Sequence, residues 1–163
     1  MDKKFREFVG VTKILNMKGI TPVLYGSLGL YQIIDPLGPI DDIDFLISDT
    51  WLTDKWPEFK TYLEENGFRM DDEHEHEFSH PDIKGWIAFG SIEESKKHSG
   101  LDKNDLELKE SNGAEYLVLN ADQYLSAYKA SLEDGYRQER KGDADKVKIR
   151  AIESHLTSHP ENQ

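Results

Sequence analysis

Two short motifs, LYGS at residues 24–27 and IDDIDFLI at residues 40–47, decide the fold that this sequence predicts. The first motif closes an apolar stretch at 22–25 that is typical of a buried strand, and the second contains a strand at 43–48. Because successive side chains of a strand point to opposite faces, Asp42 and Asp44 share one face with Leu46. Between the motifs, residues 28–34 favour a short helix, and the glycine and proline residues at 35–39 turn the chain back.

These motifs supply the groups that nucleotidyl transfer requires. Two aspartates spaced i and i+2 on a strand direct their oxygens toward one divalent cation or a pair of cations. Gly26 lets a triphosphate approach the backbone closely, and Ser27 offers a hydroxyl and an N–H at the start of a helix. The alternative is that the Gly-Ser pair only begins a helix and that the aspartates at 41, 42 and 44 are solvated charges.

The motifs resemble those of the nucleotidyltransferase superfamily, in the subgroup of lincosamide nucleotidyltransferases and abortive-infection type toxins. The resemblance implies that Ser27 binds the triphosphate and that Asp42 and Asp44 hold the magnesium ions that position and activate an ATP-like donor. Members of the subgroup often carry a lysine, then basic residues, then an acid on a C-terminal helical pair. The matching candidates in this sequence are Lys129, Arg137, Lys141 and Asp145.

The two lysines of this set have an electrostatic role to offer. Lys129 or Lys141 can neutralise a donor phosphate or the leaving pyrophosphate. The alternative is that each is a solvated lysine on a helix face.

The sequence departs from the family pattern at the third carboxylate. Catalytic members usually carry an acid on a later strand, and Ala88 stands at the corresponding position of the strand expected at 86–89. This acid often acts as a general base or completes a second metal site, so its absence puts catalysis in question. On the neighbouring strand, expected at 74–79, alternation places Glu75 and Glu77 on one face, and either is the candidate substitute. A charged edge strand is the alternative explanation of this run.

The remaining pattern predicts an α/β (α+β) fold, with a mixed sheet flanked by helices and a C-terminal helical pair. Amphipathic helices are expected at 3–17 and from a cap at Thr50 or Thr53 to about residue 65. Strands at 68–70, 74–79 and 86–89 are expected to form an antiparallel meander. A further strand is expected at 116–119, a helix capped by Asn120 and Gln123 follows, and a last helix spans 143–155. Residues 1–163 are expected to form a single nucleotidyltransferase-like domain, with about 157–163 as a frayed tail.

Composition narrows the partners and cofactors. The 163 residues carry a formal net charge of −12, which disfavours nucleic acid because lysine and arginine supply most of the affinity for phosphate backbones. The chain has no cysteine, so a metal must be held by carboxylates or imidazoles, and Mg²⁺, or else Mn²⁺, is the expected ion. No apolar run approaches the roughly 20 residues that cross a bilayer, so a cytoplasmic protein is expected. A homodimer remains open.

Together these features predict transfer of a nucleoside monophosphate from a magnesium-bound nucleoside triphosphate to a hydroxyl of a small molecule or protein. Asp42 and Asp44 hold the metal in this interpretation, and Gly26 and Ser27 hold the phosphates. One alternative is a catalytically degenerate protein of the same fold, which binds nucleotide or a protein partner without turnover. The other is an unrelated acidic interaction domain that binds no nucleotide.

Overall fold

The structure is a computed structural model that describes residues 2–133 and 135–159, with the backbone alone at 135–141. In this part of the chain, seven strands form one mixed sheet in the order β3-β4-β5-β2-β1-β7-β6. The strands are β1 Val23–Tyr25, β2 Ile43–Ile47, β3 Arg69–Asp72, β4 Glu77–His80, β5 Ile83–Ser91, β6 Glu107–Ser111 and β7 Ala114–Val118. The helices are α1 Asp2–Met17, α2 Gly26–Leu30, α3 Trp56–Glu65, α4 Ile92–Ser99, α5 Ala121–Glu133 and α6 Gly135–Ser158, with 3-10 helices η1 Asp49–Leu52 and η2 Lys103–Asp105.

The sheet combines parallel and antiparallel pairs around its two central strands. β1 runs antiparallel to β2 and parallel to β7, while β2 runs parallel to β5. The meander of β3, β4 and β5 is antiparallel, as the sequence predicts, and so is the β6–β7 hairpin. The predicted mixed sheet with flanking helices and a C-terminal helical pair is therefore confirmed.

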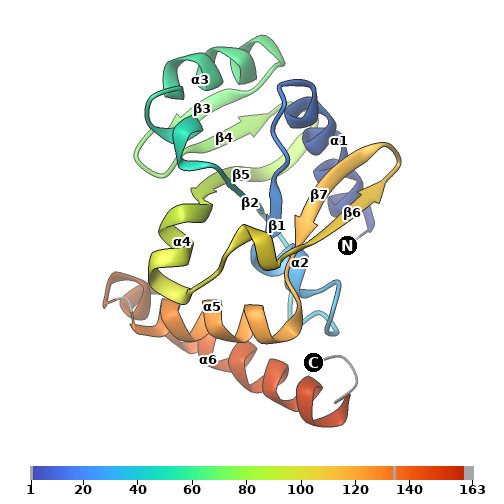
Figure 1. Cartoon of the computed structure of the whole chain (residues 1–163), viewed down its shortest axis with the longest axis vertical. Helices are drawn as coiled ribbons and strands as arrows, with labels where there is room; N and C mark the ends of the chain where they lie inside the picture. Colours follow the sequence, from blue (N-terminus) through green and yellow to red (C-terminus); the bar gives the residue numbers. More distant parts are fainter. Residues whose placement is uncertain (1, 134, 160–163) are drawn as a thin grey trace.

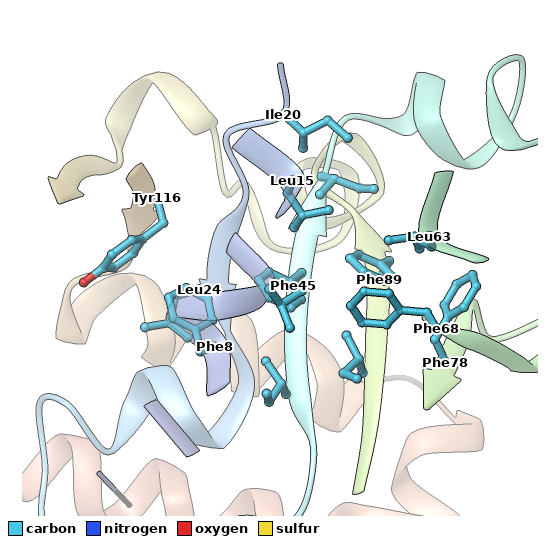
Figure 2. Close-up of a cluster of buried hydrophobic side chains, with 14 of the residues drawn as sticks. Phe8, Leu15, Ile20, Leu24, Phe45, Leu63, Phe68, Phe78, Phe89 and Tyr116 are labelled. Atoms are coloured by element: carbon cyan, nitrogen blue, oxygen red, sulfur yellow. The ribbon is translucent and has the colours of Figure 1, made fainter. Parts of the chain in front are cut away.

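Helices α1 and α3 cover one face of the sheet through an aromatic core. Phe45 of β2 lies between Phe8 of α1 and Phe89 of β5, with ring centroids 5.2 Å and 5.3 Å away (Figure 2). Phe59 of α3 packs edge-on against Phe89. Burial of these large rings supplies much of the hydrophobic free energy of folding, which fixes the position of β2 and hence of its aspartates.

Helices α2, α4, α5 and α6 contribute the core on the opposite face. Val23 of β1 and Leu46 of β2 belong to this second buried cluster, together with Tyr124 of α5 and Ile152 of α6. Helices α5 and α6 lie side by side and close this side of the fold (Figure 1). Since Asp44 alternates with Phe45, it faces the side of the sheet on which the helical pair lies.

The strand predicted at 74–79 is wrong over its first half. Residues 73–76 form a turn, and β4 begins only at Glu77. Glu75 donates its backbone N–H to Asp72 Oδ1 over 3.1 Å, and His76 adopts a positive φ of 53°. An aspartate side chain that satisfies the backbone two or three residues on favours a turn. Glu75 therefore does not alternate with Glu77 along one strand.

The chain end and the polar segment before β7 also differ from expectation. Helix α6 begins before the expected residue 143 and runs to Ser158, beyond the expected end at 155, and Leu156 is buried. Strand β6 was not predicted, because its residues are mostly exposed and show no apolar alternation.

The predicted pairing of Asn120 with Gln123 is confirmed, since each side chain accepts the other's backbone N–H, over 2.9 Å and 2.8 Å. Within the described residues, no helix combines the length and the apolar character that a membrane span requires.

Candidate active site

Gly26 and Asp44 meet where β1 passes into α2. Tyr25 at the end of β1 is paired with Asp44 in β2, which brings the aspartate beside the glycine. Gly26 has a φ of 65°, and a Cβ built there would lie 2.2 Å from Asp44 Oδ2. A side chain at this position would therefore be strained and would displace the carboxylate. The glycine predicted from the motif is needed for this close approach.

Asp42 is fixed by the neighbouring strand. It directly precedes β2, and its Oδ1 accepts the backbone N–H of Trp86 in β5 over 2.9 Å. Gly85 has a φ of 90°, and a Cβ on Gly85 would lie 1.8 Å from the carbonyl oxygen of Asp41. The chain before β2 can thus lie against β5 because residue 85 has no side chain.

A lysine from the far end of the chain reaches the glycine turn. Lys148 of α6 donates from Nζ to Ser27 Oγ over 3.0 Å, and the same Nζ lies 5.1 Å from the centre of the Tyr128 ring. The sequence interpretation did not select Lys148. The sequence feature that could have indicated Lys148 is its position one helical turn after Asp145, which is buried.

Of the two lysines that the sequence predicts for this role, Lys129 lies elsewhere, and the side chain of Lys141 is outside the described part of the chain. Lys129 of α5 places its Nζ 3.9 Å from Glu153 of α6, and its side chain is 54% exposed. It is thus an exposed partner of Glu153, in a contact of the kind that contributes little to stability. The side chains of Lys141 and Arg137 lie outside the described part of the chain.

Ala88 and Glu77 lie in one row with Asp44. Ala88 of β5 is paired with Asp44 on one side and with Glu77 of β4 on the other. Paired residues of adjacent strands share a face, so all three side chains lie on the helical-pair side. Adjacent strands are about 4.8 Å apart, which places the backbone of Glu77 about 10 Å from that of Asp44. The small side chain of Ala88 separates the two acids.

Glu77 has the electrostatic character expected of a proton acceptor beside other acids. Partial burial raises the pKa of Glu77 above its ordinary value, and the charges of four nearby carboxylates raise it further, those of Asp72, Asp42, Glu75 and Asp44. Glu75 lies in the preceding turn, exposed, with its carboxylate 3.4 Å from His74 Nδ1. The structure thus brings Glu77 into the row of Asp44, and it does not bring Glu75 there.

The donor set suits a cation that arrives with its nucleotide. Among the described residues, no group of three or more histidines, aspartates or glutamates is arranged to hold a metal ion. Magnesium is usually held by one or two carboxylates together with substrate phosphates. The two carboxylates of Asp42 and Asp44 fit that arrangement, with hard oxygen ligands and no need for a third protein ligand.

Comparison with solved structures defines the class of fold. The chain resembles the lincosamide antibiotic adenylyltransferase LnuA in its lincomycin-bound form, with a TM-score of 0.56 and 15% identity over 90% of this chain and 96% of that one. It also resembles the antibiotic-resistance factor ANT(2'')-Ia, with a TM-score of 0.59 and 12% identity over 97% and 85% of the two chains. An antigenic nucleotidyltransferase-like protein from Paracoccidioides brasiliensis gives 0.54, at 15% identity over 88% and 72%. The chain therefore has the nucleotidyltransferase fold that its two motifs predict.

A relative in sequence places the chain more narrowly. It is 40% identical over 151 residues to the "Uncharacterized protein YnaI" of Bacillus subtilis (strain 168), covering 92% of this chain and 96% of the relative. The chain belongs to the same family as that protein. No protein-family model matches the chain.

Proposed function

We propose that this protein transfers a nucleoside monophosphate from a magnesium-bound nucleoside triphosphate to a hydroxyl group of a small molecule or a protein. The observation that supports the proposal is the convergence of three groups at one end of the sheet. Asp44 lies over Gly26, Ser27 follows in the same turn, and Lys148 binds the Ser27 hydroxyl. Carboxylates for a cation, a turn without a side chain and a lysine are what triphosphate binding requires.

The donor is held by two sets of groups in this proposal. Asp42 and Asp44 hold Mg²⁺, which when bound neutralises charge on the triphosphate oxygens. Lys148 and the Ser27 hydroxyl bind phosphate oxygens, and Gly26 leaves space for them to approach the backbone. We assign Lys148 this role in place of Lys129, which lies beside Glu153.

Glu77 serves as the general base. The acceptor oxygen attacks the α-phosphorus, the bond to pyrophosphate breaks, and the proton of the acceptor hydroxyl passes to the Glu77 carboxylate. A raised pKa makes this carboxylate a better proton acceptor than an ordinary glutamate. The separation of about 10 Å between the backbones of Glu77 and Asp44 leaves room for an acceptor hydroxyl above Ala88.

The acceptor lies on the open part of the sheet in this proposal. Trp86 is on the same face of β5 as Ala88, directly beside Asp42, and its side chain is 50% exposed. An exposed indole offers an apolar surface beside the reacting groups. The net charge of −12 continues to disfavour a nucleic acid as acceptor.

A degenerate protein that binds nucleotide without turnover is the second candidate. The observation that favours it is the presence of Ala88, instead of an acid, beside Asp44. Both candidates require Asp42, Asp44 and nucleotide binding, and only the first requires a functional Glu77.

A labelled-nucleotide assay separates the two candidates. The wild-type protein is incubated with Mg²⁺ and each α-phosphate-labelled nucleoside triphosphate in a cell extract, and labelled products and pyrophosphate are measured. The transferase proposal predicts label transfer that Asp44→Asn abolishes, Glu77→Gln lowers at least about tenfold, and Ala88→Asp partly restores in the Glu77→Gln background. Wild-type protein that binds nucleotide yet transfers no label would instead support the degenerate candidate.

Lys148 and Lys129 provide a matched pair for the phosphate role. Lys148→Met should weaken binding of the triphosphate about tenfold or more, because a charged hydrogen bond to phosphate is lost. Lys129→Met should leave the affinity unchanged. Equal effects of the two substitutions on the dissociation constant would refute the assignment.

A further inference from the structure

Strand β6 forms one edge of the seven-stranded sheet, and in the described part of the chain its outer side pairs with no other strand. The β6–β7 hairpin runs along one side of the molecule (Figure 1). Residues 107–110 are exposed, and the Leu108 side chain is exposed although it is apolar. An edge strand of this kind presents unpaired N–H and C=O groups to which another strand can be added.

The opposite edge of the sheet is less suited to such pairing. In β3 the register against β4 shifts between Met70 and Asp72, whereas the register of β6 against β7 is regular from Glu107 to Ser111. An irregularity of this kind interrupts the alternation of an edge strand and turns it away from a partner. Strand β6 is therefore the edge that can continue the sheet.

The turn that joins β6 to β7 determines which backbone groups face outward. Its two residues, Asn112 and Gly113, have positive φ values of 51° and 88°, as a type I′ turn requires. In such a hairpin the residues that flank the turn form a hydrogen-bonded pair, and bonded and non-bonded pairs alternate from there along the ladder. The N–H and C=O groups of Leu108 and Glu110 therefore point away from β7.

The side chains of β6 are complementary to a second copy of the same strand. When two β6 strands run antiparallel with Leu108 opposite Leu108, Glu107 of each copy faces Lys109 of the other. These opposite charges lie in non-hydrogen-bonded pairs, in which the Cα atoms are only about 4.5 Å apart. Within one copy Lys109 Nζ lies 3.8 Å from Glu107 Oε1, so the charges of both copies form one alternating network. On the other face of the strands, the two Leu108 side chains cover each other.

Charge also distinguishes this register from its neighbours. Moving the pairing by one position along the strand sets Lys109 opposite Lys109 in one direction and Glu107 opposite Glu107 in the other. Like charges directly opposite each other destabilise a strand pair. Charged side chains on an edge strand commonly prevent association. In β6 their order favours one antiparallel register instead.

We propose that two copies of this chain associate through β6, in the antiparallel register that sets Leu108 opposite Leu108. The Leu108 N–H of each copy donates to the Leu108 carbonyl of the other, and the Glu110 N–H donates to the Leu106 carbonyl. The two copies contribute the same surface, as a twofold axis requires. Strands β1 and β7 separate β6 from β2, so this interface is distinct from the candidate active site and does not depend on the proposed transferase activity.

The test is sedimentation velocity of the full chain from about 2 to about 500 µM, because an interface of one short strand gives a weak dimer. We expect the wild type to change from monomer to dimer over this range. Glu107→Lys and Lys109→Glu should each raise the dissociation constant at least about tenfold, because each sets like charges opposite each other at both ends of the interface. An equal mixture of these two variants should dimerise, since the lysines of one then face the glutamates of the other. Glu64→Lys makes the same change of charge at an exposed position of α3 and should dimerise as the wild type does.

Several outcomes would overturn the proposal. These are a wild type that stays monomeric at every concentration, a dimer that Glu107→Lys leaves unchanged or that Glu64→Lys weakens equally, and a mixture of the two folded charge variants that associates no better than either alone. If circular dichroism shows that a charge variant does not fold, Leu108→Asp serves instead, because it sets two like charges at the centre of the interface. A folded Leu108→Asp protein that dimerises like the wild type would then refute the register.

Discussion

Gly26 and Asp44 lie so close together that a side chain at residue 26 would displace the carboxylate of Asp44. Gly26→Ala should lower the free energy of unfolding by about 1–3 kcal/mol, because the positive φ is strained for alanine and the new Cβ meets Asp44. Nucleotide affinity should fall as well, since the carboxylate is displaced. Chemical denaturation and nucleotide titration measure the two effects.

Gly10 is the matched control for this substitution. It lies within α1, and a Cβ there would meet nothing within 4 Å. Gly10→Ala should therefore stabilise the protein by about 0.5–1 kcal/mol, as alanine does in a helix interior. If Gly26→Ala unfolds like the wild type, a Cβ at residue 26 does not displace Asp44, and the two residues are not as close as described.

Glu77 gives a prediction about pH and stability. Its pKa is raised in the folded state, so the folded protein binds this proton more tightly than the unfolded chain does. The stability it contributes is present below the pKa of the unfolded chain and is lost as the pH rises through the folded pKa. Glu77→Gln should therefore unfold at a higher temperature than the wild type at neutral pH. Below the ordinary glutamate pKa of 4.5 the difference should disappear. A difference that does not change with pH would argue against the raised pKa.

At the level of single residues, the sequence indicates some residues of the candidate site and not others. The close approach of Asp44 to the Gly26-Ser27 turn could be predicted because these residues lie within 19 residues of one another on adjacent elements. Lys148 lies far along the chain, and its contact with Ser27 depends on how α6 docks. The choice between Glu75 and Glu77 depends on a turn at 73–76, which the alternation of charge conceals.

Helix α5 begins at a reciprocal cap, which makes its first turn testable. The Asn120 side chain accepts the backbone N–H of Gln123, and Gln123 accepts that of Asn120. Asn120→Ala should lower the free energy of unfolding by about 1 kcal/mol, the usual cost of losing an N-cap acceptor. Asn120→Asp keeps an acceptor oxygen and should cost little. Urea denaturation measures both, and equal losses in the two variants would contradict a capping role.

Elements with a clear apolar period could be predicted, and elements without one could not. Helix α1 and strands β1, β2 and β7 carry apolar patterns of helical or strand type, and their positions agree with prediction to within a few residues. Strand β6 has no such pattern because it is an edge strand exposed on most of its residues. Its place in the sheet comes from pairing with β7.

The order of strands in the sheet could not be predicted from local pattern. In the sheet, β1 lies between β2 and β7, although nearly 90 residues of the chain separate β1 from β7. The row of Asp44, Ala88 and Glu77 depends on the same long-range pairing, because a shift of one residue would move Glu77 to the other face. The class of fold was nevertheless predictable, because both motifs lie in its centre.

The aromatic core on the α1 side holds these strands in register. Phe45→Ala should lower the free energy of unfolding by about 3–5 kcal/mol, because it leaves a cavity between Phe8 and Phe89. Leu108 is 58% exposed on β6, so Leu108→Ala should change stability by less than about 0.5 kcal/mol. Thermal denaturation of both variants checks the contrast. Comparable losses would show that the core does not centre on Phe45.

Calorimetric titration of ATP, GTP, CTP and UTP into the protein, with and without Mg²⁺, tests whether Asp42 and Asp44 hold a magnesium-bound nucleotide. Asp42→Asn and Asp44→Asn are titrated in parallel, because they keep the shape of the side chains and remove the charges that hold the cation. We expect magnesium-dependent binding of at least one nucleotide by the wild type, lost in both variants. Binding of no nucleotide, or binding that both variants retain with Mg²⁺, would contradict it.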